Sequence, residues 1–314
     1  MAGALLSVVV PTYCGRDSIE PLLARLRATL DGRGLPFEVV VVNDASPDDT
    51  WSVLQKLSRE YPELHAIDLL NNHGQPMATM CGIYHARGTL VATLDDDLQH
   101  PPEELAKLLD ALDEHPDWDV VVGAWERDEG WFRDLGSWVF QLADRVAHGT
   151  PKGFRHSGFR VMRRPAARAL IEHETRMPSI GPLLKQIARN VHNVPVEHHE
   201  RPYGRSGFQI GEGVYRVISH FLHGTALPLR LLSRFGLLCA GLAVALGLYF
   251  FSRWLLGYQT LMGWASSFLA IVFFGGSALF GIGILGEYTH LLIREVRRPP
   301  RWNIREDLPR DDAP

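Results

Sequence analysis

The sequence contains only three cysteines among its 314 residues, Cys14, Cys81 and Cys239. Their number is odd and their spacing is wide, so they suggest neither a cysteine metal cluster nor a disulfide framework. The large soluble part of the chain is therefore expected in a reducing, cytosolic environment.

An excess of positive charge is also missing. The formal net charge is −4, and no stripe of Lys and Arg alternates with aromatic residues, so nucleic acid is not an expected partner. Residues 1–211 contain neither G-x-G-x-x-G nor a Walker pattern, and a nucleotide bound there would therefore need a metal ion and arginines for its phosphates. The segment Met1–Leu6 has no basic stretch before a long apolar run, so no signal peptide is expected.

Charged residues are nearly absent from two segments near the C-terminus. Phe235–Ser252 and Trp254–Gly286 contain none, and only Arg253 lies between them. Spans at about 235–256 and 264–286, 22 and 23 residues long, would each cross a bilayer as a helix. Arginines precede the first span and follow the second, which predicts cytoplasmic ends and a two-helix hairpin. We expect a multi-pass membrane protein with its large N-terminal domain on the cytoplasmic side.

The segment 212–232 has apolar residues at helical spacing, which form one face. They are Val214, Val217, Ile218, Phe221 and Leu222. A core-facing helix and an amphipathic helix lying on the bilayer both fit this pattern, and the adjacent span favours the second. The expected domains are a cytosolic domain at 1–211, this interfacial helix at 212–232, two transmembrane helices within 233–290, and a tail at 291–314 that is basic and then disordered from Glu306.

Short apolar runs alternate with amphipathic stretches in the first half of the chain. The expected strands are Leu6–Pro11, Phe37–Val42, Leu64–Leu70, Thr89–Leu94 and Trp118–Gly123, with helices at about 17–32, 48–60, 75–87 and 101–115. Beyond them we expect helices at Trp131–His148, Arg164–His173 and Ile180–Asn190, a strand at Gly158–Arg163, and an extended segment at Val191–His199. This alternation predicts an α/β domain with a Rossmann-like, mostly parallel sheet.

Ligands of such sheets bind beyond the carboxyl ends of the strands. Thr12–Tyr13, Asn43–Asp44 and Asp95–Asp97 each follow an expected strand. We therefore expect these three polar clusters to lie close together on one rim of the sheet.

Three consecutive carboxylates, Asp95, Asp96 and Asp97, end the fourth expected strand. Placing them together is electrostatically costly unless a cation lies nearby. Mg²⁺ or Mn²⁺ shared with a substrate diphosphate would fit such oxygen ligands. A solvated acidic turn that caps the helix starting at Pro101 is the alternative reading.

Two residues at the other strand ends could bind a nucleoside. Asp44 could accept hydrogen bonds from a base or ribose, and Tyr13 could pack on a base ring. For Ser46, Asp48 and Asp49 we favour helix capping.

Several motifs together resemble one family. They are Val10-Pro11-Thr12-Tyr13, Val42-Asn43-Asp44-Ala45-Ser46, Asn72-His73-Gly74-Gln75, Asp95-Asp96-Asp97-Leu98-Gln99-His100-Pro101-Pro102-Glu103, Trp131-Phe132-Arg133 with Ser137, Arg201 with Gly204 and Ser206, and Leu285-Gly286-Glu287-Tyr288. The chain resembles the inverting GT-A glycosyltransferases that act on polyprenyl phosphates, such as dolichyl-phosphate mannose synthases and bactoprenol glucosyltransferases. Within this branch it is most similar to the undecaprenyl-phosphate 4-deoxy-4-formamido-arabinose transferases.

The resemblance implies a role for each matching residue. Donor-nucleotide contacts are implied for Pro11, Tyr13, Asp44, Asp95 and Asp96, and metal ligation of Mg²⁺ or Mn²⁺ for Asp97 and Gln99. The acceptor phosphate would contact Arg133 and Ser137, and the diphosphate would contact Arg127 and Arg201. Asp97, Arg133 and Arg201 are the expected catalytic residues.

The sequence departs from the family pattern at three places. Cys14-Gly15-Arg16 replaces the usual acidic residues, Phe154 stands where many relatives carry Asp, and Gly207 stands where Lys is usual. These departures bear on the sugar and phosphate contacts more than on the fold or the metal site.

The expected reaction is inverting transfer of a sugar from a nucleotide diphosphate, with uridine favoured, to undecaprenyl or another polyprenyl phosphate. The lipid-linked sugar would serve cell-envelope or glycan modification. A phosphate monoester has a second pKa of about 6, so the acceptor needs no general base. The alternatives are a polysaccharide synthase of the same fold, although the Q-x-x-R-W motif is absent, and a non-catalytic membrane-anchored protein that binds nucleotide sugars. Family likeness also suggests a homo-oligomer of tetramer type.

Overall fold

The computed structural model describes residues 5–125, 154–173, 180–199, 263–296 and 301–308, with scattered residues between 234 and 256. Two compact units divide the chain, one formed by Met1–Gly207 with Arg298–Pro314 and the other by Phe208–Arg297. Several predicted features lie outside the described residues. They are the site residues Arg127, Arg133, Ser137 and Arg201, the helix expected at 131–148, the interfacial helix at 212–232 and most of the first predicted span.

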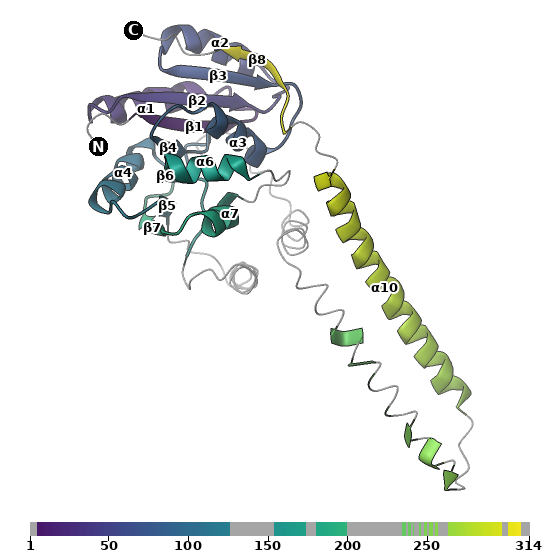
Figure 1. The fold of residues 1–314 in the computed structure, drawn as a ribbon. Helices are drawn as coiled ribbons and strands as arrows, with labels where there is room; N and C mark the ends of the chain where they lie inside the picture. The colour runs from purple at the N-terminus through teal and green to yellow at the C-terminus, as the bar shows by residue number, and fades with distance from the viewer. Residues whose placement is uncertain are drawn as a thin grey trace. The chain divides into compact units, whose positions relative to one another are not determined.

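An eight-stranded sheet forms the centre of the first unit (Figure 1). Its strands are β1 (Leu6–Thr12), β2 (Phe37–Asn43), β3 (Leu64–Leu69), β4 (Leu90–Thr93), β5 (Val120–Ala124), β6 (Arg160–Arg163), β7 (Val191–Pro195) and β8 (Ile304–Leu308). The spatial order is β7-β5-β6-β4-β1-β2-β3-β8. Strands β3, β2, β1 and β4 run parallel, as the alternating sequence pattern predicted. Strand β6 is antiparallel to both β4 and β5.

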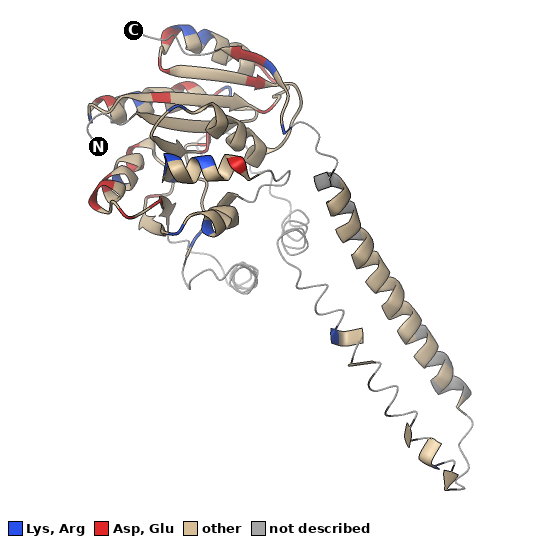
Figure 2. Ribbon diagram, in the orientation of Figure 1, with Lys and Arg blue, Asp and Glu red and all other residues tan. Residues whose placement is uncertain are grey.

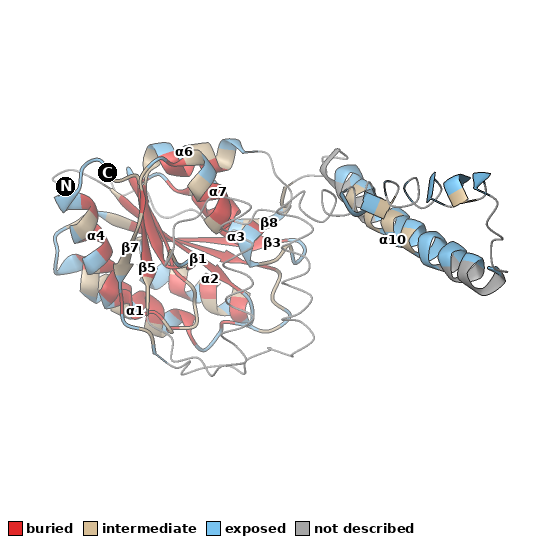
Figure 3. Cartoon of the chain, turned by 90° about the horizontal axis from the view of Figure 1, so that it is seen from below, coloured by how far each residue is buried: buried red, intermediate tan, exposed pale blue. Residues whose placement is uncertain are grey.

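Helices cover both faces of the sheet (Figure 3). One face carries α1 (Ile19–Asp31), α2 (Thr50–Glu60) and α4 (Leu105–Glu114), and the other carries α3 (Gln75–His85), α6 (Arg164–Glu172) and α7 (Ile180–Ile187). A short 3₁₀ turn, η1 (Pro102–Glu104), precedes α4. Because β1 is covered on both sides, all of its residues are buried, which explains its continuous apolar run.

Successive side chains of β1 belong to different hydrophobic cores. Val8 and Val10 pack in the core under α1, α2 and α4, whereas Val9 packs in the core under α3, α6 and α7. A side chain at Gly82 would overlap with Val9, so this glycine lets α3 approach β1 closely. Charged residues lie mainly on the helices and at strand ends, while most of the sheet is tan in Figure 2.

The C-terminal strand corrects one sequence-based expectation. Disorder was expected from Glu306 onward, but Glu306, Asp307 and Leu308 lie in β8, which pairs antiparallel with β3. Two charged residues of this strand have specific partners. Trp51 Nε1 donates to Glu306 at 2.9 Å, and Arg305 donates to the buried Asp68 at 3.1 Å.

In the second unit the main described element is α10 (Trp264–Val296), which contains the helix predicted at 264–286. Large apolar side chains such as Ile271, Leu279 and Phe280 are exposed along it. No helix within the described part of the chain is both long enough and apolar enough to cross a membrane.

Candidate active site

Three parallel strands bring distant polar residues to one rim of the sheet, as the sequence predicted. The Thr12 hydroxyl, at the end of β1, donates to the Asp96 carboxylate beyond β4 at 2.5 Å. The Cys14 backbone N–H donates to Ser46 Oγ, beyond β2, at 2.9 Å. The ends of β1, β2 and β4 are therefore tied together directly.

Unusual backbone conformations occur where the chain leaves these strands. Cys14, Ala45 and Leu98 have φ values of 57°, 54° and 56°, although none is a glycine. Such conformations are uncommon for residues with a Cβ, and they concentrate at binding sites because surrounding contacts must hold them. Each lies next to a predicted site residue, namely Tyr13, Asp44 or Asp97.

Asp96 lies in the middle of the carboxylate cluster. Desolvation of this carboxylate raises its pKa to about 6; the Thr12 hydrogen bond acts against this shift, and Asp95 and Asp97 add to it. A Cβ at Gly15 would overlap with both the Thr12 hydroxyl and the Asp96 carboxylate. Gly15, one of the departures from the family pattern, therefore leaves the space that Thr12 and Asp96 occupy.

Asp95 is approached by several elements. Gln75 Nε2, at the start of α3, donates to its carboxylate at 2.6 Å. A Cβ at Gly158 would lie 2.9 Å from both Asp95 oxygens, so the backbone before β6 passes directly beside the carboxylate. The geometry fixes Asp95 tightly at the rim.

Arg160 places a buried positive charge beside this cluster. It lies in register with Thr93, and its Nε donates to Thr93 Oγ1 at 3.1 Å. Burial lowers its pKa to about 10 and Asp95 acts against this shift, so the guanidinium stays charged at neutral pH. This role was not predicted from the sequence, where the strand reads Arg-Val-Met-Arg and carries an arginine at each end.

Asp97 and Gln99 occupy the turn after the cluster. The Asp97 carboxylate accepts the Gln99 backbone N–H at 3.1 Å, and the Gln99 carbonyl accepts the His199 N–H at 2.8 Å. The Gln99 amide nitrogen lies 3.3 Å from His198 Nε2, and the His198 ring stacks on Trp125 at 4.3 Å. The role of His198 was likewise not predicted from the sequence.

The remaining predicted donor contacts have definite places in the structure. Each oxygen of the buried Asp44 carboxylate accepts a backbone N–H at 2.7 Å, one from His73 and one from Gly74. Asp44 therefore positions the loop before α3. Tyr13 is 53% exposed at the rim, whereas Pro11 is buried within β1.

Residues 7–171 match the family model Glycosyl transferase family 2. The chain belongs to this family. It is 34% identical to an undecaprenyl-phosphate 4-deoxy-4-formamido-L-arabinose transferase from Edwardsiella ictaluri, over 95% of this chain and 93% of the relative. A transferase of the same name from Sodalis glossinidius is 32% identical over 95% of this chain and 92% of its own length. The protein is accordingly a glycosyltransferase.

Solved structures support the GT-A type of fold. A glucosyl-3-phosphoglycerate synthase from Mycobacterium tuberculosis, in complex with phosphoglyceric acid, superimposes on this glycosyltransferase with a TM-score of 0.51. The match has 21% sequence identity and covers 71% of this chain and 80% of that one. The same synthase in complex with Mn²⁺, UDP-glucose and phosphoglyceric acid also gives a TM-score of 0.51, at 20% identity with the same coverage.

Proposed function

We propose that this glycosyltransferase transfers a sugar from a nucleotide diphosphate, with uridine favoured, to undecaprenyl or another polyprenyl phosphate. The observation that carries the proposal is the gathering of Asp95, Asp97 and Gln99 at the carboxyl rim of the parallel strands. The curated relatives, which match almost the full chain, are named undecaprenyl-phosphate sugar transferases. The lipid-linked product would serve cell-envelope or glycan modification.

The oxygen atoms at the rim suit a hard divalent cation. Asp97 and Gln99 would hold Mg²⁺ or Mn²⁺, since carboxylate and amide oxygens are the ligands that these ions prefer. The synthase of the same fold that binds Mn²⁺ with UDP-glucose supports this assignment. A bound cation would neutralise part of the diphosphate charge as the leaving group departs.

The protein's own residues would perform the remaining tasks. Asp95 and Asp96 would contact the donor; Gln75 would hold Asp95 by its hydrogen bond, and Arg160 would supply a nearby positive charge. Tyr13 is exposed at the rim, where it would pack on the base. Asp44 would shape the donor site by holding the loop before α3 in position.

The acceptor side of the proposal rests on residues outside the described part of the chain. Arg133 and Ser137 would bind the acceptor phosphate, and Arg127 and Arg201 the diphosphate. Paired guanidinium donors match phosphate oxygens well. Because the acceptor phosphate is largely dianionic, the enzyme's work would be to align two anions rather than to remove a proton. In-line attack would invert the anomeric centre.

A lipid acceptor requires the enzyme to act at a membrane surface. The apolar segments at 235–256, where Arg253 is the one charged residue, and at 264–286, which has none, support a two-helix hairpin, and the exposed apolar side chains of α10 agree with a lipid environment. We place the catalytic domain on the cytoplasmic side of the inner membrane, from the arginine distribution around the two segments. A homo-oligomeric, tetramer-like assembly remains part of the proposal.

Cation-dependent donor binding tests this proposal. The purified full chain would be titrated with UDP in Mn²⁺, and again in excess chelator, with binding measured by calorimetry. We expect binding that needs the cation and that weakens at least tenfold in Asp97→Asn, because one charged ligand is lost. The matched control is Asp113→Asn in α4. Equal UDP binding with and without the cation, or equal binding by Asp97→Asn and wild type, would contradict the metal assignment.

A further inference from the structure

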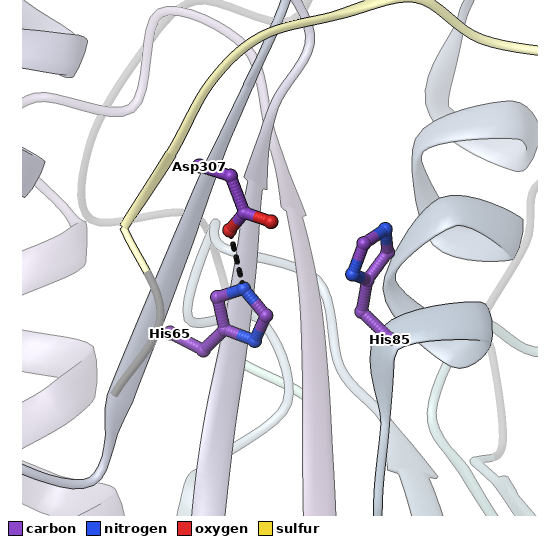
Figure 4. Close-up of side chains that lie close together, drawn as sticks. All are labelled: His65, His85 and Asp307. Atoms are coloured by element: carbon purple, nitrogen blue, oxygen red, sulfur yellow. Dashed lines mark hydrogen bonds and ion pairs between the residues drawn. The ribbon is translucent and has the colours of Figure 1, made fainter. Parts of the chain in front are cut away.

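A second group of side chains that could bind a metal lies away from the rim, where the edge strand β8 pairs with β3. His65 belongs to β3, His85 is the last residue of α3, and Asp307 belongs to β8. One potential ligand atom from each lies within 4.8 Å of the other two. Figure 4 shows the Asp307 carboxylate joined to the His65 ring, with the His85 imidazole facing both across a gap.

The three side chains meet because of strand register. Asp307 pairs with Ile67, two residues from His65, so both side chains project toward the face that α3 covers. His65 Nε2 lies 2.6 Å from Asp307 Oδ1, and the two imidazole rings meet edge-on with centroids 5.6 Å apart. The residues are 20 or more positions apart in sequence, yet three elements deliver them to one point.

The site combines a fixed ligand with an accessible one. Asp307 is 40% exposed, which leaves an entry path from solvent, while His65 is buried and fixed.

We propose that His65, His85 and Asp307 form a second metal site, for Zn²⁺ or a similar borderline transition-metal ion, which fastens the C-terminal strand to the sheet. Two imidazoles and one carboxylate are a familiar zinc ligand set, whereas Mg²⁺ and Mn²⁺ prefer the oxygen ligands of the rim. The ion would take the place of the proton between His65 and Asp307, and a water molecule would complete a tetrahedron.

Binding requires only small movements. Zinc–nitrogen and zinc–oxygen bonds of about 2.0–2.2 Å place tetrahedral ligands about 3.4 Å apart. The His65–Asp307 contact would therefore lengthen from 2.6 Å, and His85 would move inward from its present separation of up to 4.8 Å. His85 is half-buried and Asp307 is exposed, so both side chains have room to adjust.

The nearby thiol does not belong to the ligand set. Cys81 precedes His85 by one helical turn and is fully buried. It is not one of the three residues whose ligand atoms lie within 4.8 Å of one another. The site is thus expected to bind through two nitrogens and one oxygen.

The ion would stabilise an attachment that the protein already makes. Trp51 and Gln55 hold β8 through Glu306, and the backbone ladder pairs it with β3. A metal that binds the folded state adds stability by mass action without being required for folding. We therefore expect a well-folded metal-free protein that zinc stabilises.

The test uses the untagged full chain, purified and stripped of metal, in an Asp97→Asn background that disables the rim site. Zinc binding would be measured by competition with a chromophoric chelator, and coordination by the visible absorption of Co²⁺. We expect His85→Gln and Asp307→Asn each to weaken zinc binding at this site at least tenfold. Each should also remove the absorption bands of tetrahedral Co²⁺. The matched control is His173→Gln, an exposed histidine at the end of α6.

Thermal unfolding gives an independent readout. Zinc should raise the Tm of the Asp97→Asn protein and of the His173→Gln control, but not that of Asp307→Asn. Asp307→Asn keeps an acceptor for His65, so its metal-free fold should persist. Identical zinc affinity and Tm shift in all the variants, or no zinc binding by the parent protein, would show that His65 and Asp307 form only a hydrogen bond.

Discussion

Arg160 Nε donates to Thr93 Oγ1 at 3.1 Å, across the antiparallel pair of β6 and β4. This bond fixes a buried guanidinium where β4 ends and the carboxylates of Asp95 and Asp96 begin. A buried charge is costly without a counter-charge, and each side of this arrangement supplies one for the other. Arg160 is therefore a positioning residue for the rim carboxylates and need not touch the substrate.

Replacing Arg160 tests this positioning role. Arg160→Met should raise the KM for the nucleotide sugar about tenfold or more, because Asp95 loses its neighbouring cation. Arg160→Lys should recover part of the loss, since it keeps the charge without the planar hydrogen-bonding geometry. KM, kcat and Tm would be measured together. A lower Tm with unchanged KM in both variants would reduce Arg160 to a purely structural residue.

A substitution at Gly158 tests whether the position of the Asp95 carboxylate matters for donor binding. In Gly158→Ala the new methyl group would lie 2.9 Å from both Asp95 oxygens, so the carboxylate must move. We expect roughly tenfold weaker donor binding and a loss of about 1–3 kcal/mol in the free energy of unfolding, as is typical of overpacking. Calorimetry with UDP and Mn²⁺, together with thermal unfolding, would check both effects.

Gly32→Ala is the control for this experiment. A Cβ there would have ordinary contacts, the nearest at 3.5 Å, and φ is −61°, which alanine adopts readily. Its donor binding should equal that of the wild type. If Gly158→Ala behaves like Gly32→Ala, then Asp95 is not held as tightly as the structure indicates.

Replacing Arg133 distinguishes acceptor binding from donor binding. Arg133→Ala should lower the transfer rate roughly a hundredfold at subsaturating polyprenyl phosphate, by analogy with the loss of a positioned charge-stabilising donor. Nucleotide-sugar affinity without acceptor should stay near wild type. Equal damage to donor affinity would assign Arg133 to the diphosphate, and full activity would place it on the surface.

The proposed hairpin predicts which reagent reaches its turn. In a variant without native cysteines, Thr260→Cys should react with a membrane-impermeant maleimide added outside the inner membrane. The reason is that the arginines place both ends of the hairpin in the cytoplasm. Labelling of inverted vesicles alone would mean that residues 257–263 do not cross.

Much of the catalytic unit could be predicted because its strands are buried on both faces and read as apolar runs. The rim followed from one rule, that parallel strands end on the same edge. Strand β8 was missed because it is an edge strand, whose charged residues find partners only on distant elements such as α2. Arg160 and His198 were missed for a related reason, since their roles depend on Thr93 and Gln99, which are far away in sequence.

The central claim is sugar transfer to a lipid phosphate, and direct transfer measures it best. The purified full chain would be incubated with undecaprenyl phosphate, Mg²⁺ or Mn²⁺, and a panel of radiolabelled UDP- and GDP-sugars, with the lipid fraction counted. We predict label in the lipid for at least one UDP-sugar, dependent on the cation and absent in Asp97→Asn. No lipid-linked label from any donor, with cation and acceptor present, would contradict the account.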